Sequence, residues 1–94
     1  MPSGPLTRVL VFDEDASARE CMHDWLEDAG FDVLDASDSN QAETLLDHRR
    51  PAVLLLTLPD APGTDLQARL RVLDRARRAN PPIRVIVRIP AGGD

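Results

Sequence analysis

The chain contains no lysine and has few cysteine or aromatic residues. All 11 basic residues are arginine, so no mechanism that needs a lysine amine is open to it. Cys21 is the single cysteine, which excludes a disulfide within the chain; its place among helical apolar residues predicts a buried thiol. No apolar run approaches the roughly 20 residues of a membrane span, and the first residues lack the basic and apolar regions of a signal peptide. These absences favour a cytoplasmic protein.

The charges are divided unevenly between the two halves of the chain. Residues 1–47 hold 12 of the 16 acidic residues and two arginines, a net charge of −10, whereas residues 48–94 hold four acids and nine arginines, a net charge of +5. The whole chain carries −5, which makes it a poor general binder of nucleic acid. Its length of 94 residues allows one small domain.

Short apolar runs alternate with amphipathic segments along the whole chain. Strands alternating with helices predict a parallel sheet with right-handed crossovers. The run Val53–Thr57 is apolar on both faces, which is typical of a central strand covered on both sides. Strands are expected over Arg8–Phe12, Phe31–Ala36, Val53–Thr57 and Ile83–Ile89, with helices over residues 16–29, from the polar cluster 37–40 to Pro51, and over 64–79.

The first helical segment carries an apolar stripe. Its residues recur at helical spacing, so we expect this face to be buried against the sheet. Gly30 follows the segment in the position where a left-handed residue ends a helix. The stripe consists of Ala18, Met22, Trp25 and Ala29, with Cys21 and Leu26 beside it.

Three carboxylates follow the first strand directly. The apolar run Val9–Phe12 ends at Asp13, Glu14 and Asp15. Open α/β folds bind ligands at the carboxyl edge of their sheet, and clustered carboxylates there repel one another and gain from a hard cation such as Mg²⁺. The alternative is that Asp15 caps the next helix and the other two are solvated.

These residues resemble the receiver domain of two-component response regulators. Asp13 and Glu14 match the acidic pair that binds Mg²⁺ in that family, and residues 59–63 match its Pro-x-x-x-Gly loop. The resemblance implies a flavodoxin/CheY-like, doubly wound parallel sheet in the order 2-1-3-4. It implies a tail over residues 1–7 and a receiver-like domain over residues 8–94, without the last helix-strand-helix portion of the family.

The chain departs from the family at the residues that carry its chemistry. Thr57 stands where the family keeps the phosphoacceptor aspartate, Ile89 stands where it keeps a small hydroxyl residue, and its lysine is absent. The acidic pair would therefore be a weak or lost Mg²⁺ site, and no other cofactor is expected. Asp60, three residues after Thr57, is a displaced phosphoacceptor in one alternative and an exposed turn residue in the other.

The resemblance and these departures together imply a pseudo-receiver without enzymatic activity. Such a module of a two-component or phosphorelay regulator would act by protein–protein interaction or dimerisation, without aspartyl phosphorylation. The expected partners are a sensor kinase or output domain and a second copy. Strand 83–89 would lie at an open sheet edge, and self-association is expected through Val85, Ile86 and Val87.

The remaining charged and polar candidates favour simpler interpretations. His23 and His48 have no second histidine at ligand spacing and are expected to be surface residues. The arginines of the third helix are expected to form a solvated face; the alternatives are a surface for an acidic partner or, less favoured without interleaved aromatics, for nucleic acid. They are Arg69, Arg71, Arg75, Arg77 and Arg78.

Overall fold

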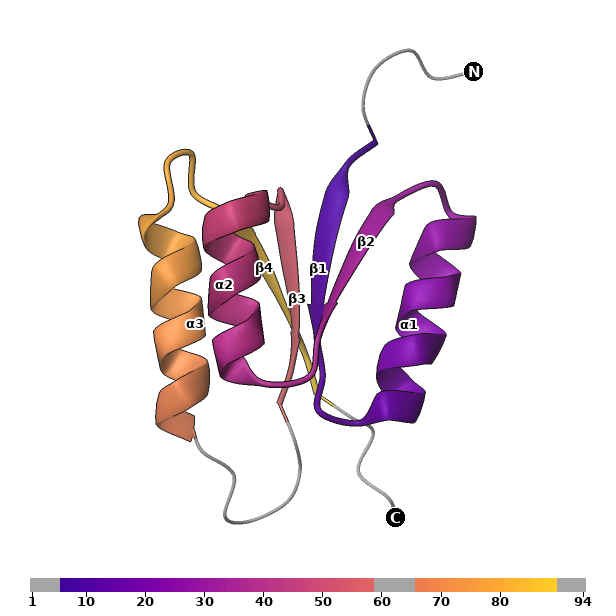
Figure 1. The fold of residues 1–94 in the computed structure, drawn as a ribbon, viewed down its shortest axis with the longest axis horizontal. Helices are drawn as coiled ribbons and strands as arrows, with labels where there is room; N and C mark the ends of the chain where they lie inside the picture. Colours follow the sequence, from indigo (N-terminus) through magenta and orange to yellow (C-terminus); the bar gives the residue numbers. More distant parts are fainter. Residues whose placement is uncertain (1–5, 59–65, 90–94) are drawn as a thin grey trace.

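The computed structural model describes residues 6–58 and 66–89 of the chain. These residues form three layers, with α2 and α3 on one side of a parallel sheet and α1 on the other (Figure 1). Asp60 and the Pro-x-x-x-Gly loop lie outside the described residues, as does Thr64, the expected start of the third helix. The elements are β1 (Arg8–Phe12), α1 (Ala16–Asp28), β2 (Asp32–Ala36), α2 (Ser39–Arg49), β3 (Val53–Thr57), α3 (Leu66–Arg78) and β4 (Arg84–Arg88).

The sheet has four parallel strands in the order β2-β1-β3-β4, which confirms the expected topology. Each expected strand is present, although β2 and β4 are shorter than their apolar runs. In the register of the sheet, Leu55 lies between Val11 of β1 and Ile86 of β4. Val53–Thr57 is the central strand that its two apolar faces predicted.

The ends of α1 and α2 show why each helix begins and stops where it does. Asp15 caps α1 by accepting hydrogen bonds from the backbone N–H groups of Ser17 and Ala18. Gly30 follows with a φ of 97°, the left-handed conformation expected for it. Asp38 caps α2 in the same way, through the N–H of Gln41. The helix-capping alternative for Asp15 is therefore confirmed.

Two apolar clusters of unequal size hold the layers together. The larger lies between the sheet and the pair α2 and α3, and includes the fully buried Leu54 and Leu56. The smaller lies under α1, where Val9, Val11 and Leu55 meet the partly buried Met22 and Leu26, among others. Most of the burial is thus on the face with two helices.

The buried face of α1 is rotated from the one that its apolar stripe predicted. Met22 and Leu26 pack on the sheet, but the side chain of Trp25 is 71% exposed, and Cys21 and Ala29 are exposed. The prediction of a buried thiol and a buried tryptophan was wrong. A single helix covers only part of the sheet, so one edge of its wide apolar arc has nothing to pack against.

The apolar row of β4 is covered only at its start. Ile83 is buried and Val85 half-buried, but Val87 is 45% and Ile89 74% exposed. Coverage stops there because α3 packs near the beginning of β4. The N–H of Ile83 donates a hydrogen bond to the carbonyl oxygen of Ala76, in the last turn of α3, at 3.0 Å.

Candidate functional site

The acidic residues after β1 lie at the carboxyl edge of the sheet, as the sequence predicted. Asp13 is only 4% exposed, and its N–H donates to the carbonyl of Ala36 at the end of β2. One carboxylate oxygen, Oδ1, accepts the N–H of Asp15 at 2.9 Å. The other, Oδ2, lies 3.5 Å from Nη1 of Arg88, a long contact that is mainly electrostatic.

The second carboxylate of the pair belongs to an ion pair with a buried arginine. Nη2 of Arg69, from the first turn of α3, lies 2.6 Å from Oε1 of Glu14. The Arg69 side chain is 3% exposed and that of Glu14 is 54% exposed. The guanidinium of Arg69 also stacks 5.4 Å from the centre of the Phe12 ring, and its Nε makes a long 3.4 Å contact with the carbonyl oxygen of Thr57.

Thr57 is the last residue of β3 and has Arg69 and Arg88 as neighbours. It is 6% exposed, and in the register of the sheet it pairs with Arg88. A third arginine, Arg19 of α1, donates to the main-chain carbonyl of Asp13 at 2.8 Å. A hydroxyl residue with little solvent access therefore ends β3 close to cationic side chains.

At the carboxyl edge of the sheet, arginine side chains of the chain supply the positive charge next to the acidic pair. Arg69 and Arg88 each lie against one member of the acidic pair, so the repulsion that would favour a divalent cation is already offset by guanidinium groups. Within 6–58 and 66–89, no three His, Cys, Asp or Glu side chains are grouped so that they could hold a metal ion. The arrangement supplies fixed ion pairs that join β1, α3 and β4.

The sequence interpretation missed all three of these arginines. Arg69 was expected on a solvated face, yet Ala68, Arg69, Val72 and Ala76 are the buried residues of α3. A signal was present, because Arg69 lies three residues before Val72 and seven before Ala76, on the buried side of the helix. An arginine on that side needs a carboxylate nearby, and Glu14 is the one it meets.

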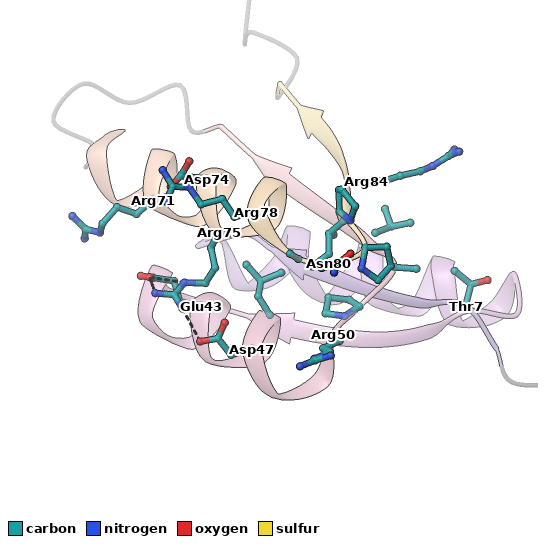
Figure 2. Close-up of a pocket in the computed structure, with 18 residues that line it drawn as sticks. Thr7, Glu43, Asp47, Arg50, Arg71, Asp74, Arg75, Arg78, Asn80 and Arg84 are labelled. Carbon is teal, nitrogen blue, oxygen red and sulfur yellow. Dashed lines mark hydrogen bonds and ion pairs between the residues drawn. The ribbon is translucent and has the colours of Figure 1, made fainter.

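Two of the other four arginines of α3 are paired as well. Arg75 contacts Glu43 and Asp47 of α2, the latter at 2.6 Å, and Arg78 contacts Asp74 at 3.0 Å. These pairs lie in a broad hollow between α2, α3 and the starts of β3 and β4, at the opposite edge of the sheet from the acidic pair (Figure 2). Pairing leaves less free positive charge for nucleic acid than the sequence alone indicated.

The side chain of His23 is partly buried and is held by two carboxylates, unlike that of a solvent-exposed histidine. Its Nδ1 lies 2.8 Å from Oδ2 of Asp35 on β2, and its Nε2 lies 3.4 Å from Oε2 of Glu27. The hydrogen bond to Asp35 raises the pKa of His23 above its ordinary value, and desolvation by burial opposes this effect in part. These contacts tie α1 to β2 and leave His48 as the exposed histidine that was expected.

Comparisons with known proteins agree with this fold. The phosphate regulon transcriptional regulatory protein PhoB of Pseudomonas aeruginosa is 35% identical over 65 residues, which cover 67% of this chain and 28% of that protein. The beryllofluoride-activated NtrC receiver domain is 27% identical with a TM-score of 0.68, over 97% of this chain and 69% of that one. A response regulator receiver protein from Pseudomonas putida is 22% identical with a TM-score of 0.72, over 93% and 70%. No family model matches.

The fold and the edge described above define a flavodoxin/CheY-like α/β domain. Within that class, the chain has the receiver fold of two-component response regulators, as its sequence resemblance implied. It spans a little over a quarter of the PhoB sequence and about 70% of the two receiver domains named above. Within the part of the chain that the structure describes, no helix is both long and apolar enough to cross a membrane.

Proposed function

We propose that this chain is a pseudo-receiver, a signalling module that acts through protein–protein contacts without forming an aspartyl phosphate. The observation that carries the proposal is the pair of arginines, Arg69 and Arg88, lying against the acidic residues where a receiver would hold its cation. Thr57 lacks the carboxylate that a phosphoryl group would be transferred to. A threonine hydroxyl is also a poor nucleophile unless a base activates it.

The ion pairs would hold the module in one state. A receiver switches because binding of a cation and a phosphoryl group changes the charge at this edge, whereas here the compensating charge is covalently part of the chain. The output would then be constitutive or set by the arrival of a partner. Partners of this kind are a sensor kinase, an output domain or another copy of the chain.

A phosphodonor should leave the protein chemically unchanged. Acetyl phosphate, or beryllofluoride as a phosphate mimic, with millimolar Mg²⁺ should give no mass increase and no change in the amide spectrum, because Thr57 cannot form an acyl phosphate. The measurement is intact mass after a short incubation and a two-dimensional amide spectrum with and without beryllofluoride. A phosphorylatable receiver treated in parallel is the positive control.

The variant Asp60→Asn separates the two phosphorylation hypotheses. A stoichiometric phosphate adduct on the wild-type chain that is lost in Asp60→Asn would make Asp60 the acceptor and overturn the pseudo-receiver proposal. An unmodified wild-type chain is the expected result. Asp60 lies outside the described residues, so its placement contributes nothing to the proposal.

We also propose that the chain self-associates through the open edge of β4. The N–H of Arg84 and the carbonyl of Arg88 both bond toward β3, at 3.1 and 2.9 Å. Because these groups alternate along a parallel strand, Val85 and Val87 direct their N–H and C=O groups outward. An outward row of this kind is a template for a second strand. Two-fold pairing would be isologous and antiparallel.

Proline at position 85 should abolish edge pairing while keeping β4 in the sheet. Val85→Pro removes an outward donor, and bonding to β3 does not use that donor. We expect the wild-type chain to give a dimer or larger species by light scattering at high micromolar concentration, and Val85→Pro to give monomer. A wild-type chain that remains monomeric at that concentration would refute self-association.

A further inference from the structure

The ring of His23 lies between two carboxylates, one on β2 and one on its own helix, α1. Its Nδ1 is 2.8 Å from Oδ2 of Asp35, and its Nε2 is 3.4 Å from Oε2 of Glu27, one helical turn further on. A neutral imidazole has a single N–H, so its other ring nitrogen would turn a lone pair toward a carboxylate. Only the protonated ring can donate to both carboxylates.

Asp35 needs a positive charge more than an ordinary surface carboxylate does. Its Oδ1 is buried and has no hydrogen-bond partner within residues 6–58 and 66–89. Its Oδ2 makes the short contact with His23. A carboxylate oxygen that is buried without a partner is costly unless opposite charge lies close by. The protonated ring of His23 supplies that charge, whereas the neutral ring supplies a hydrogen bond alone.

The surroundings of the ring also favour its charged form. A polar hollow of about 310 Å³ lies beside it. Below the helix, β1 faces α1 with the apolar Val9 and Val11. Arg19 is the positive group of the hollow, and its guanidinium donates to the main-chain carbonyl of Asp13 at 2.8 Å. The charged side chains that line the hollow or contact the ring are Arg19, Glu20, Asp24 and Glu27 of α1 and Asp35 of β2.

The pKa of His23 links this geometry to the stability of the fold. The hydrogen bond with Asp35 is the main cause that raises this pKa above its ordinary value of 6.5; desolvation by burial opposes it, and the charges of Asp35 and Glu27 add to it. Because the folded chain binds the proton more tightly than the unfolded chain does, protonation stabilises the fold. This contribution is fully present below the unfolded pKa and is lost as the pH rises through the folded pKa.

We propose that protonation of His23 fastens α1 to β2, so that the attachment of this helix responds to pH near neutrality. The pairs at the acidic edge do not share this response, because arginine stays charged over this range. The contact lies within one chain and on the side of α1 toward β2, the strand at the opposite end of the sheet from β4. It is therefore independent of the proposed self-association and of the phosphodonor result.

Titration of the His23 ring by NMR tests the two carboxylate contacts. The midpoint in the wild-type chain should lie above 6.5. Asp35→Asn should lower it most and Glu27→Gln less, because the contact with Asp35 is the shorter one. Asp24→Asn removes an exposed acid of the same hollow and is the matched control, with little expected change. A wild-type midpoint at or below 6.5, or one that Asp35→Asn leaves unchanged, would overturn the inference.

The stability lost in His23→Gln should depend on pH. Between about pH 5.5 and about pH 8.5, the excess of the wild-type urea midpoint over that of His23→Gln should shrink several-fold, because the wild-type chain loses its imidazolium. His48→Gln is the matched control, since His48 is exposed and the described residues give it no ion pair. Its difference from the wild-type chain should be the same at both pH values. A constant difference for His23→Gln would contradict the proposal.

Hydrogen exchange shows whether the proton acts on α1 or on the whole fold. After correction for the intrinsic exchange rate, the protection of the α1 amides in the wild-type chain should fall several-fold over the same pH range, and that of the β3 amides should fall less. The α1 amides of His23→Gln should have the lower protection at both ends of the range. An equal fall over α1 and β3 would show a general loss of stability and would overturn the proposed fastening of α1.

Discussion

Leu55→Ala should lower the free energy of unfolding by about 2–5 kcal/mol, the range for removing a buried leucine side chain. Leu55 is 9% exposed at the middle of the central strand, where it packs with Val9 and Val11 in the cluster under α1. In the part of the chain that the structure describes, α1 is the one helix above this cluster, so few other side chains are available to fill the space that the leucine would leave. For a domain whose total stability is on the order of 5–15 kcal/mol, the loss is a large share.

The control for this experiment is Arg71→Ala on α3. Arg71 is exposed, and the described residues give it no ion pair that its removal would break. It should cost less than about 1 kcal/mol, as most exposed substitutions do. Urea unfolding of the three proteins under one set of conditions measures both values. Equal midpoints for the two variants would show that the burial assigned to β3 is wrong.

Glu14→Ala should destabilise the chain by about 1.5–3 kcal/mol, the range for a hydrogen bond to a charged group. The variant would leave the Arg69 guanidinium, which is 3% exposed, without its carboxylate. Among residues 6–58 and 66–89 it would then contact only the Phe12 ring and, at 3.4 Å, the carbonyl oxygen of Thr57. A buried cation without its carboxylate is costly even where the pair itself contributed little. Chemical denaturation at neutral pH provides the measurement.

A double-mutant cycle distinguishes this explanation from a general effect of removing an acid. Arg69→Met keeps an unbranched side chain of similar length and removes the charge, so it should cost less than Glu14→Ala. Glu14→Ala combined with Arg69→Met should be no less stable than Arg69→Met alone. Glu20→Ala, an exposed acid on α1, should change stability by less than about 0.5 kcal/mol. Additive losses in the double variant would show that Glu14 and Arg69 are not coupled.

The proposal for self-association through β4 and the proposal for the acidic edge rest on different groups of the chain. The acidic edge concerns charge compensation within one chain, through Arg69 and Arg88. Self-association through β4 concerns the outward main-chain groups of Val85 and Val87. A partner that binds at either surface would not need a phosphoryl group to do so, which is the behaviour expected of a module without receiver chemistry.

Local sequence determined the order and kind of the elements. The apolar runs, and the polar residues that separate them, predicted each described strand and helix within a few residues. Val53–Thr57 was identified as a central strand because both of its faces are apolar. Gly30 was assigned correctly, and the cap at Asp15 was one of the two alternatives that the sequence offered, since helix ends depend on residues close in the chain. The carboxyl-edge position of Asp13 followed from the strand that precedes it.

Tertiary structure alone decided which side chains those elements bury and which charges they bring together. Trp25 belongs to the apolar arc of α1, but among the described residues no second helix lies beside α1 on that side of the sheet, and so the residue is exposed. Arg69 and Glu14 are 55 residues apart, and their contact depends on how α3 crosses the end of β3. The periodicity of apolar residues predicts which face of a helix is apolar. What that face packs against depends on segments that are distant in the sequence.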